Sequence, residues 1–176
     1  MNGDTLWQEA ITKEMKNSRI AFQFLDIDDS PPLGYTEITC RLIFDVKMDL
    51  ARKARYVAGG HLTDPHSSMT YASVVGRETV RIAFLEAALN DLKVIAKDIQ
   101  NAFVNAFTKE KIYFRAGDEW KAKGKIIVIT RALYGLKSLA LMWRNQLADI
   151  IGNKLGFKSS LADPDLWYKA ILHQKE

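Results

Sequence analysis

The stretch "ITCRLIFDVKMDLARKARYVAG", residues 38–59, decides the fold because it predicts a β-hairpin. Its first half places an apolar side chain at every second position: Cys40, Leu42, Phe44, Val46 and Met48. Such alternation is typical of a strand with one buried face. A second candidate strand, "ARYVAG", follows a polar turn at residues 49–53. The two strands are therefore expected to pair as an antiparallel hairpin near residues 39–58.

Positive charge gathers near the tip of this predicted hairpin. The basic residues between positions 41 and 55 are Arg41, Lys47, Arg52, Lys53 and Arg55, against only Asp45 and Asp49. One interpretation is a solvated charged turn, and the other is a surface for an anionic partner. The formal net charge of +4 for the whole chain does not decide between them.

Helical periodicity marks three other segments. Residues 6–17 show it first, and residues 76–91 are apolar around most of a helix, which predicts a buried helix near 77–91. A long amphipathic helix is expected near 137–155, ended by Gly156. The run of Asp, Ser and Pro within residues 22–38 predicts a loop there.

Apolar runs and turn signals predict the remaining elements. They are a short buried strand near 93–98, a helical turn at 101–107, strands within 111–117 and 125–135, and a last strand near 165–171. Strands and helices follow one another without a regular βαβ rhythm, so the expected fold class is α+β, with an antiparallel sheet packed on helices. The last strand should leave an unprotected sheet edge.

Composition excludes several protein classes. The 176 residues are 48% hydrophobic, which suits one domain or a large piece of one. No apolar run approaches the roughly 20 residues that span a bilayer, and the first residues do not form a signal peptide, so we expect an intracellular, soluble protein. The single Cys40 excludes an internal disulfide. A small metal enzyme using His61, Asp64 and His66 is disfavoured because "HLTDPH" lacks helical ligand spacing.

The stretch "KVIAKDIQNAF", residues 93–103, places a carboxylate, Asp98, at the end of the predicted buried strand. An aspartate there can cap the following turn or meet Lys97. It can also bind Mg²⁺, which prefers hard oxygen ligands. One aspartate does not suffice for two-metal phosphoryl transfer, where several carboxylates hold two ions about 4 Å apart.

Six motifs in order carry a resemblance to a known family. They are "WQEAITKEM", "FDVKMDLARKARYVAGGHLT", "YASVVGRETVRIAFLEAA", "KDIQNAF", "RALYGLKSLALMW" and "LADPDLW". Together they resemble the reverse transcriptases (RNA-dependent DNA polymerases) of copia-type retrotransposons, over about residues 7–169. The resemblance implies an incomplete right-hand polymerase: a single partial domain over 1–176, with fingers at about 7–75 and a partial palm at about 76–171.

The resemblance also implies site residues. Asp98 would be the first catalytic carboxylate and bind Mg²⁺, with the Ile99 backbone carbonyl as a further ligand. Lys53 and Arg55 would approach the nucleotide triphosphate, and which of them does so stays open. Phe103 would lie beneath the incoming sugar, although spacing alone equally favours a core aromatic. The residues expected to contact nucleic acid are Arg52, Tyr134 and Lys137, and Tyr134 could equally be structural.

The chain also departs from the family pattern. It contains no Tyr-x-Asp-Asp motif, has Ser138–Leu141 ("SLAL") where Gln-Ala-Pro-Arg is common, and has Ser73 where proline is usual. We therefore expect little or no Mg²⁺ binding and no catalysis by these residues alone.

Two functions follow. The first is a fragment of an RNA-directed DNA polymerase of a copia-type retrotransposon, which in the intact enzyme catalyses template-directed nucleotidyl transfer. Its partners would be an RNA or DNA template–primer and deoxynucleoside triphosphates, in the cytoplasm (element particle) or nucleus. The second is a non-catalytic remnant that binds nucleic acid or self-associates through an exposed sheet edge.

Overall fold

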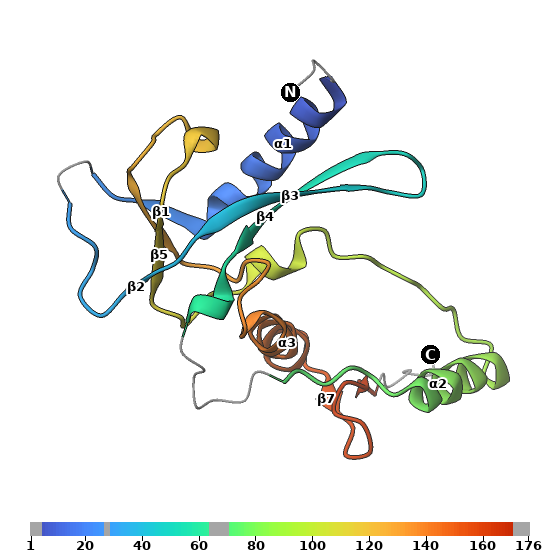
Figure 1. The fold of residues 1–176 in the computed structure, drawn as a ribbon. Helices are drawn as coiled ribbons and strands as arrows, with labels where there is room; N and C mark the ends of the chain where they lie inside the picture. Colours follow the sequence, from blue (N-terminus) through green and yellow to red (C-terminus); the bar gives the residue numbers. More distant parts are fainter. Residues whose placement is uncertain (1–4, 27–28, 64–70, 171–176) are drawn as a thin grey trace. The chain divides into compact units, whose positions relative to one another are not determined.

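The structure, a computed structural model, describes residues 5–26, 29–63 and 71–170. It shows a mixed α/β fold (Figure 1). The α-helices in this part of the chain are α1 (Thr5–Ser18), α2 (Arg77–Leu89) and α3 (Leu139–Asp149). The chain divides into two compact units, the first comprising Met1–Thr70 and Asn101–Trp143, and the second Tyr71–Gln100 and Arg144–Glu176.

The first unit contains a four-stranded sheet in the order β1-β6-β5-β2. The strands are β1 (Phe22–Phe24), β6 (Ile126–Ile129), β5 (Ile112–Arg115) and β2 (Thr36–Glu37). Neighbouring strands are antiparallel, except that β2 runs parallel to β5. The two central strands, β5 and β6, are nearly continuous apolar runs, and because of this their side chains are buried in the core.

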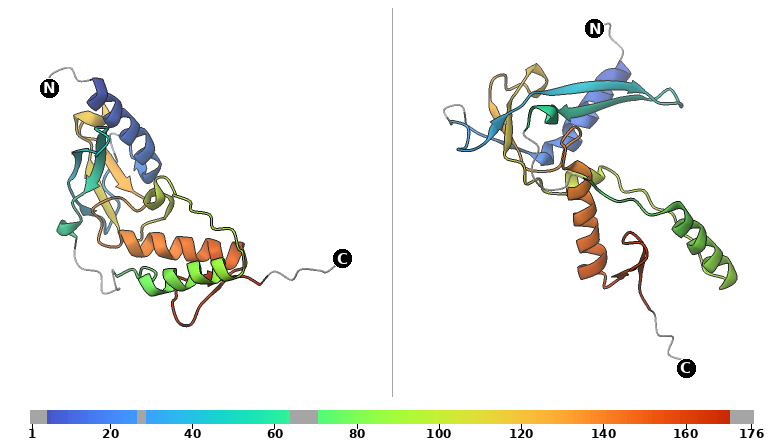
Figure 2. Two further views of the ribbon diagram at one scale, coloured as in Figure 1. Left: turned by 90° about the vertical axis from the view of Figure 1, so that its right-hand side faces the viewer. Right: turned by 60° about the horizontal axis from the view of Figure 1, so that its bottom comes forward.

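The predicted hairpin is confirmed. Strands β3 (Cys40–Val46) and β4 (Arg52–Ala58) pair antiparallel along their full length, from Cys40 opposite Ala58 to Val46 opposite Arg52. Strand β4 buries alternate side chains, so Tyr56 faces the core while Arg55 lies on the other face. Helix α1 lies against β4 (Figures 1 and 2).

The second unit is organised by the loop that contains the "LADPDLW" motif, residues 161–167. Asp163 accepts a hydrogen bond from the Gly76 N–H at the start of α2, at 2.8 Å. Asp165 forms an ion pair with Arg144, with 2.8 Å between Oδ1 and Nε. The loop joins β7 (Lys158–Ser159) to β8 (Trp167–Tyr168), which pair antiparallel. It therefore connects the start of α2 with the part of α3 that belongs to this unit.

Several other predictions are confirmed. Helices α1 and α3 form where the periodicity places them, and α3 continues as a π-helical turn at Ile150–Lys154. Gly156 follows with a φ of 73° and donates its N–H to Gly152, as a helix-ending glycine does. The expected helical turn is the 3-10 helix Ala102–Asn105.

The prediction of a strand near 93–98 was wrong. Residues 92–99 belong to no strand, and their side chains are exposed, with Ile95 75% accessible. The apolar run "VIA", residues 94–96, has no strand partner in the described part of the chain. A strand is stable only when its backbone pairs and one of its faces packs.

The prediction that the helix near 77–91 is buried was also wrong. Helix α2 forms, but Ala87 is its one buried residue, and large side chains such as Ile82, Phe84 and Leu89 are more than half exposed. The expected last strand is reduced to β8. The predicted loop over 22–38 contains β1 and β2, because pairing with β6 and β5 gives these short segments strand geometry.

Candidate functional site

Three predicted site residues meet in the first unit. The Arg55 guanidinium carbon lies 5.9 Å from the centre of the Tyr134 ring. The Phe103 ring packs edge-on against the same ring, with centroids 5.4 Å apart. We call these three residues the Arg55–Tyr134–Phe103 cluster. Its members come from β4, from the loop after β6 and from the 3-10 helix Ala102–Asn105, so the fold brings together three segments that are distant in sequence.

Backbone contacts hold Tyr134 against the hairpin. The Ala58 N–H donates to the Tyr134 carbonyl at 2.7 Å. A Cβ on Gly135, whose φ is 92°, would lie 2.0 Å from the Ala58 carbonyl oxygen, and one on Gly60 would lie 2.2 Å from the Gly135 oxygen. Only glycine permits so close an approach. The two glycines therefore explain why the "ALYGLK" and "VAGG" segments can touch.

Positive charge lies beside the aromatic pair. Arg55 meets Asp45 at 3.4 Å, with both side chains partly exposed. Such an exposed pair contributes at most about 1 kcal/mol, so an anionic ligand can compete for the guanidinium. Lys53 is two residues away on the same face of β4 and stands opposite Asp45 in the register. On this face of the hairpin, Arg41 of β3 joins Lys53 and Arg55, so the cations outnumber the Asp45 carboxylate.

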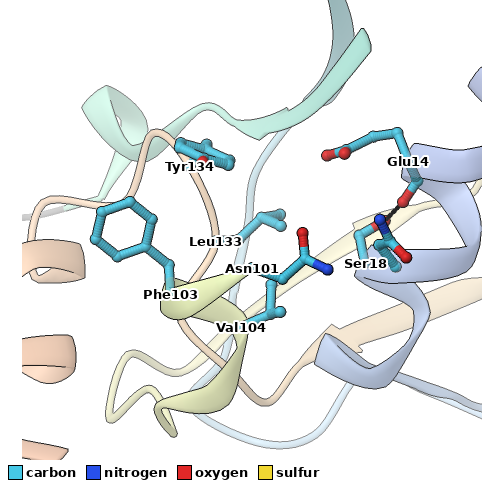
Figure 3. Close-up of a pocket in the computed structure, with 8 residues that line it drawn as sticks. Glu14, Ser18, Asn101, Phe103, Val104, Leu133 and Tyr134 are labelled. Atoms are coloured by element: carbon cyan, nitrogen blue, oxygen red, sulfur yellow. Dashed lines mark hydrogen bonds between the residues drawn. The ribbon is translucent and has the colours of Figure 1, made fainter. Parts of the chain in front are cut away.

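A small pocket adjoins the cluster (Figure 3). Phe103 and Tyr134 lie on one side of it, Glu14 and Ser18 of α1 on the other, and Asn101 projects between them. The other lining residues are Asn17, Val104 and Leu133. Its cavity volume of about 20 Å³ accommodates about one water molecule. A ligand as large as a nucleotide therefore does not fit inside this pocket.

The other predicted nucleic-acid contacts point elsewhere within the same unit. Arg52 donates to the Leu50 carbonyl and lies over the Trp7 ring, 5.5 Å from its centre. Lys137 donates to the Thr63 carbonyl. Both side chains are partly exposed. Their contacts with nucleic acid stay predictions.

Asp98 and Ile99 belong to the second unit, in the exposed segment that follows α2. Within the described residues, no group of three His, Cys, Asp or Glu side chains could hold a metal ion. Of the disfavoured metal set, His61 is exposed, and Asp64 and His66 lie outside the described residues.

Reasoning from the sequence missed a buried network beneath the cluster. Tyr56 is fully buried, accepts a hydrogen bond from the Trp120 indole N–H and donates one to Glu119, both at 2.9 Å. Burial raises the pKa of Tyr56 far above its ordinary value, so the hydroxyl keeps its proton. Glu14 accepts the Tyr56 backbone N–H at 2.9 Å. Tyr56 occupies one of the alternate positions of β4 that face the core, and this position is a signal that could have singled it out.

The same burial acts on the cysteine of β3. Desolvation, with a smaller contribution from Glu119, raises the pKa of Cys40 to about 12. The thiol is therefore protonated at neutral pH.

Ser138, where the chain departs from the family pattern, donates from both its N–H and its hydroxyl to the buried carboxylate of Glu110.

Comparisons with known proteins bear on this site. The profile of the family described as "Reverse transcriptase (RNA-dependent DNA polymerase)" matches residues 26–175. The Transposon Ty1-DR4 Gag-Pol polyprotein of Saccharomyces cerevisiae is 29% identical over 126 residues, which cover 69% of this chain and 8% of that polyprotein. The Ty1-DR6 and Ty1-LR2 Gag-Pol polyproteins of the same yeast are also 29% identical, over 7% of their lengths. No solved structure matches the chain.

The chain thus spans less than a tenth of these polyproteins. In the described residues, no helix has the length and apolarity needed to cross a membrane. The family match extends over most of the sequence and includes β3, β4 and the Arg55–Tyr134–Phe103 cluster. The chain belongs to the reverse transcriptase family and is similar to part of the Ty1 Gag-Pol polyproteins.

Proposed function

We propose that this chain is the part of an RNA-directed DNA polymerase that binds the incoming deoxynucleoside triphosphate and the template–primer. The observation that supports this proposal is the Arg55–Tyr134–Phe103 cluster, in which residues predicted from three separate motifs meet. In the intact enzyme the reaction is template-directed nucleotidyl transfer.

The chemistry of the cluster suits a nucleotide. A guanidinium donates paired hydrogen bonds to phosphate oxygens, and the Lys53 ammonium adds a point charge on the same strand face. In our proposal Phe103 lies under the sugar, where its ring collides with a 2′-hydroxyl and so favours deoxynucleotides. Tyr134 contacts both the cation and Phe103.

The template–primer is proposed to contact two other basic residues of the first unit, Arg52 and Lys137, which point away from the cluster. Phosphate contacts of this kind fix the position of a duplex without reading its sequence. For Mg²⁺, we propose that the Asp98 carboxylate and the Ile99 carbonyl supply part of the ligand set, since hard oxygen donors suit this ion. The remaining ligands would come from residues other than these two.

An exposed apolar surface in the second unit favours a second candidate function. Ile82, Leu85 and Leu89 of α2 and Ile95 beyond it are each more than half accessible. Soluble monomers rarely leave large apolar patches uncovered. A non-catalytic remnant that self-associates would use such a surface or the short edge of β7 and β8. Monomeric behaviour at micromolar concentration in analytical ultracentrifugation would reject it.

Duplex binding tests the first proposal. Replacing Arg52, Lys53 and Arg55 together with alanine should weaken binding to a primer–template in a sequence-independent way. The salt dependence should flatten too, by about 0.9 in the log–log slope for each lost phosphate contact. Fluorescence anisotropy over a salt series measures both quantities.

The matched control removes the same charge from a different surface of the first unit. Lys121, Lys123 and Lys125 lie in or beside the turn before β6, and their triple alanine variant should bind the duplex much as the wild type does. If the two triple variants have the same affinity and salt slope, the hairpin has no special role in binding.

A further inference from the structure

The buried face of β4 carries a second set of contacts that the proposed binding surface does not use. On this face the Tyr56 ring packs against Phe22, Phe114 and Trp120, with centroids 5.4–5.9 Å apart. Its hydroxyl accepts a hydrogen bond from Trp120 and donates one to Glu119. Tyr56 is thus the point at which the hairpin is joined to the core of the first unit.

Glu14 fixes the same residue from another direction. Its carboxylate accepts the Tyr56 N–H at 2.9 Å, which ties α1 to the backbone of β4. The carboxylate also lines the small pocket beside Phe103 and Tyr134 (Figure 3). One side chain therefore contacts both the strand that carries Arg55 and the pocket beside its aromatic partners.

The geometry of a strand links these contacts to the ligand face. Adjacent side chains of β4 point to opposite faces, so any roll of the strand that moves Tyr56 also moves Arg55. The hydrogen bond from the Tyr56 N–H to Glu14 limits sliding of β4 along its own axis. The Tyr56 hydroxyl, at the far end of the ring, is held by Trp120 and Glu119, and these two hydrogen bonds limit rolling of the strand. The Arg55 guanidinium stays 5.9 Å from the centre of the Tyr134 ring only if both movements of β4 are limited.

We propose that Glu14 and Tyr56 are positioning residues, which hold β4 so that Arg55 lies over Tyr134 on the ligand-binding face. The functional part of this inference rests on the proposed binding of nucleotide and template–primer by that face. The structural part, that Glu14 and Tyr56 keep Arg55 in place over Tyr134, does not rest on that binding.

Hydrogen exchange of the 176-residue chain tests the hold directly. In Glu14→Ala the Tyr56 amide loses its acceptor, and its protection against exchange should fall about tenfold or more. Glu14→Gln keeps an acceptor oxygen and should restore most of the protection. Glu9→Ala, an exposed site on the same helix, is the matched control and should leave the Tyr56 amide unchanged.

A spectroscopic arm separates positioning from simple stabilisation. Tyr56→Phe removes the hydroxyl only, so the Trp120 indole N–H resonance should move. The ring resonances of Tyr134 should move with it, because Arg55 shifts over that ring. If Tyr134 is unchanged in both Glu14→Ala and Tyr56→Phe, or if the Tyr56 amide keeps its protection in Glu14→Ala, the inference is overturned. Tyr56→Phe also keeps the test decisive if Glu14→Ala does not fold.

Duplex binding then reports the functional part. Glu14→Ala and Tyr56→Phe should each weaken binding several-fold, and neither should weaken it further in an Arg55→Ala background, since all three changes act through Arg55. Additive losses would overturn the functional part. A wild-type chain that does not bind the duplex would reject the proposed function, and the exchange and Tyr134 measurements would still decide the positioning role.

Discussion

At the scale of single residues, the contact between Gly135 and Ala58 gives a direct prediction. Gly135→Ala should destabilise the chain by about 3 kcal/mol or more, because its Cβ would lie 2.0 Å from a backbone oxygen that cannot move away. Gly124 is the matched control: its φ of 81° is similar, but a Cβ there meets nothing within 4 Å. Gly124→Ala should cost about 1 kcal/mol from backbone strain alone. Urea unfolding measures both, and equal losses would contradict the close contact.

At the scale of elements, Asp163 governs how α2 begins. Hydrogen bonds from the Thr79 side chain and the Gly76 backbone lower the pKa of Asp163. A carboxyl whose folded pKa is depressed contributes stability above its unfolded pKa of about 3.9, and this contribution is lost as the pH falls through the folded pKa. The Gly76 amide resonance should therefore titrate below about pH 3.9.

Asp163→Asn should abolish this titration and reduce the protection of the first α2 amides. Asp91→Asn, which removes an exposed carboxylate elsewhere in the second unit, should leave the Gly76 titration in place. A Gly76 resonance that still titrates in Asp163→Asn would show that another group caps the helix.

The same elements show what the sequence can and cannot predict. The β3–β4 hairpin was predictable because its alternation and its turn are local. Strands β1 and β2 were not, because Phe22 pairs with Ile129, more than a hundred residues away, and three residues carry too little periodicity. The prediction of a strand before Asp98 was wrong for the opposite reason. Its apolar pattern is clear, but no partner strand is present in the described residues.

The candidate site divides along similar lines. The motifs singled out Arg55, Phe103 and Tyr134, and the structure brings them together. Glu14 could not be singled out, because α1 carries two glutamates, Glu9 and Glu14, and their sequence positions do not distinguish them. Its role depends on which backbone N–H it meets, and only the packing of α1 against β4 decides that.

At the scale of the whole molecule, the chain supplies one proposed catalytic carboxylate, Asp98. Positioning the attacking and leaving oxygens requires two ions held together. Primer extension by residues 1–176 should therefore be undetectable in a gel assay with Mg²⁺ and deoxynucleotides. In a longer protein that includes a downstream Tyr-x-Asp-Asp motif, synthesis should appear, and Asp98→Asn should abolish it. Activity of the 176-residue chain, or full activity of the longer Asp98→Asn enzyme, would contradict the assignment.

The exposed segment at residues 92–99 has a consequence for handling the protein. Proteases bind their substrates as extended chains, and this segment is already outside any helix or strand, with Lys93 and Lys97 accessible. Brief trypsin treatment should cut here well before it cuts β5 or β6. A cut after Lys97 would leave Asp98 at a new amino terminus, no longer covalently joined to α2. A preparation nicked in this way would run as two fragments on a denaturing gel while its hairpin remained intact.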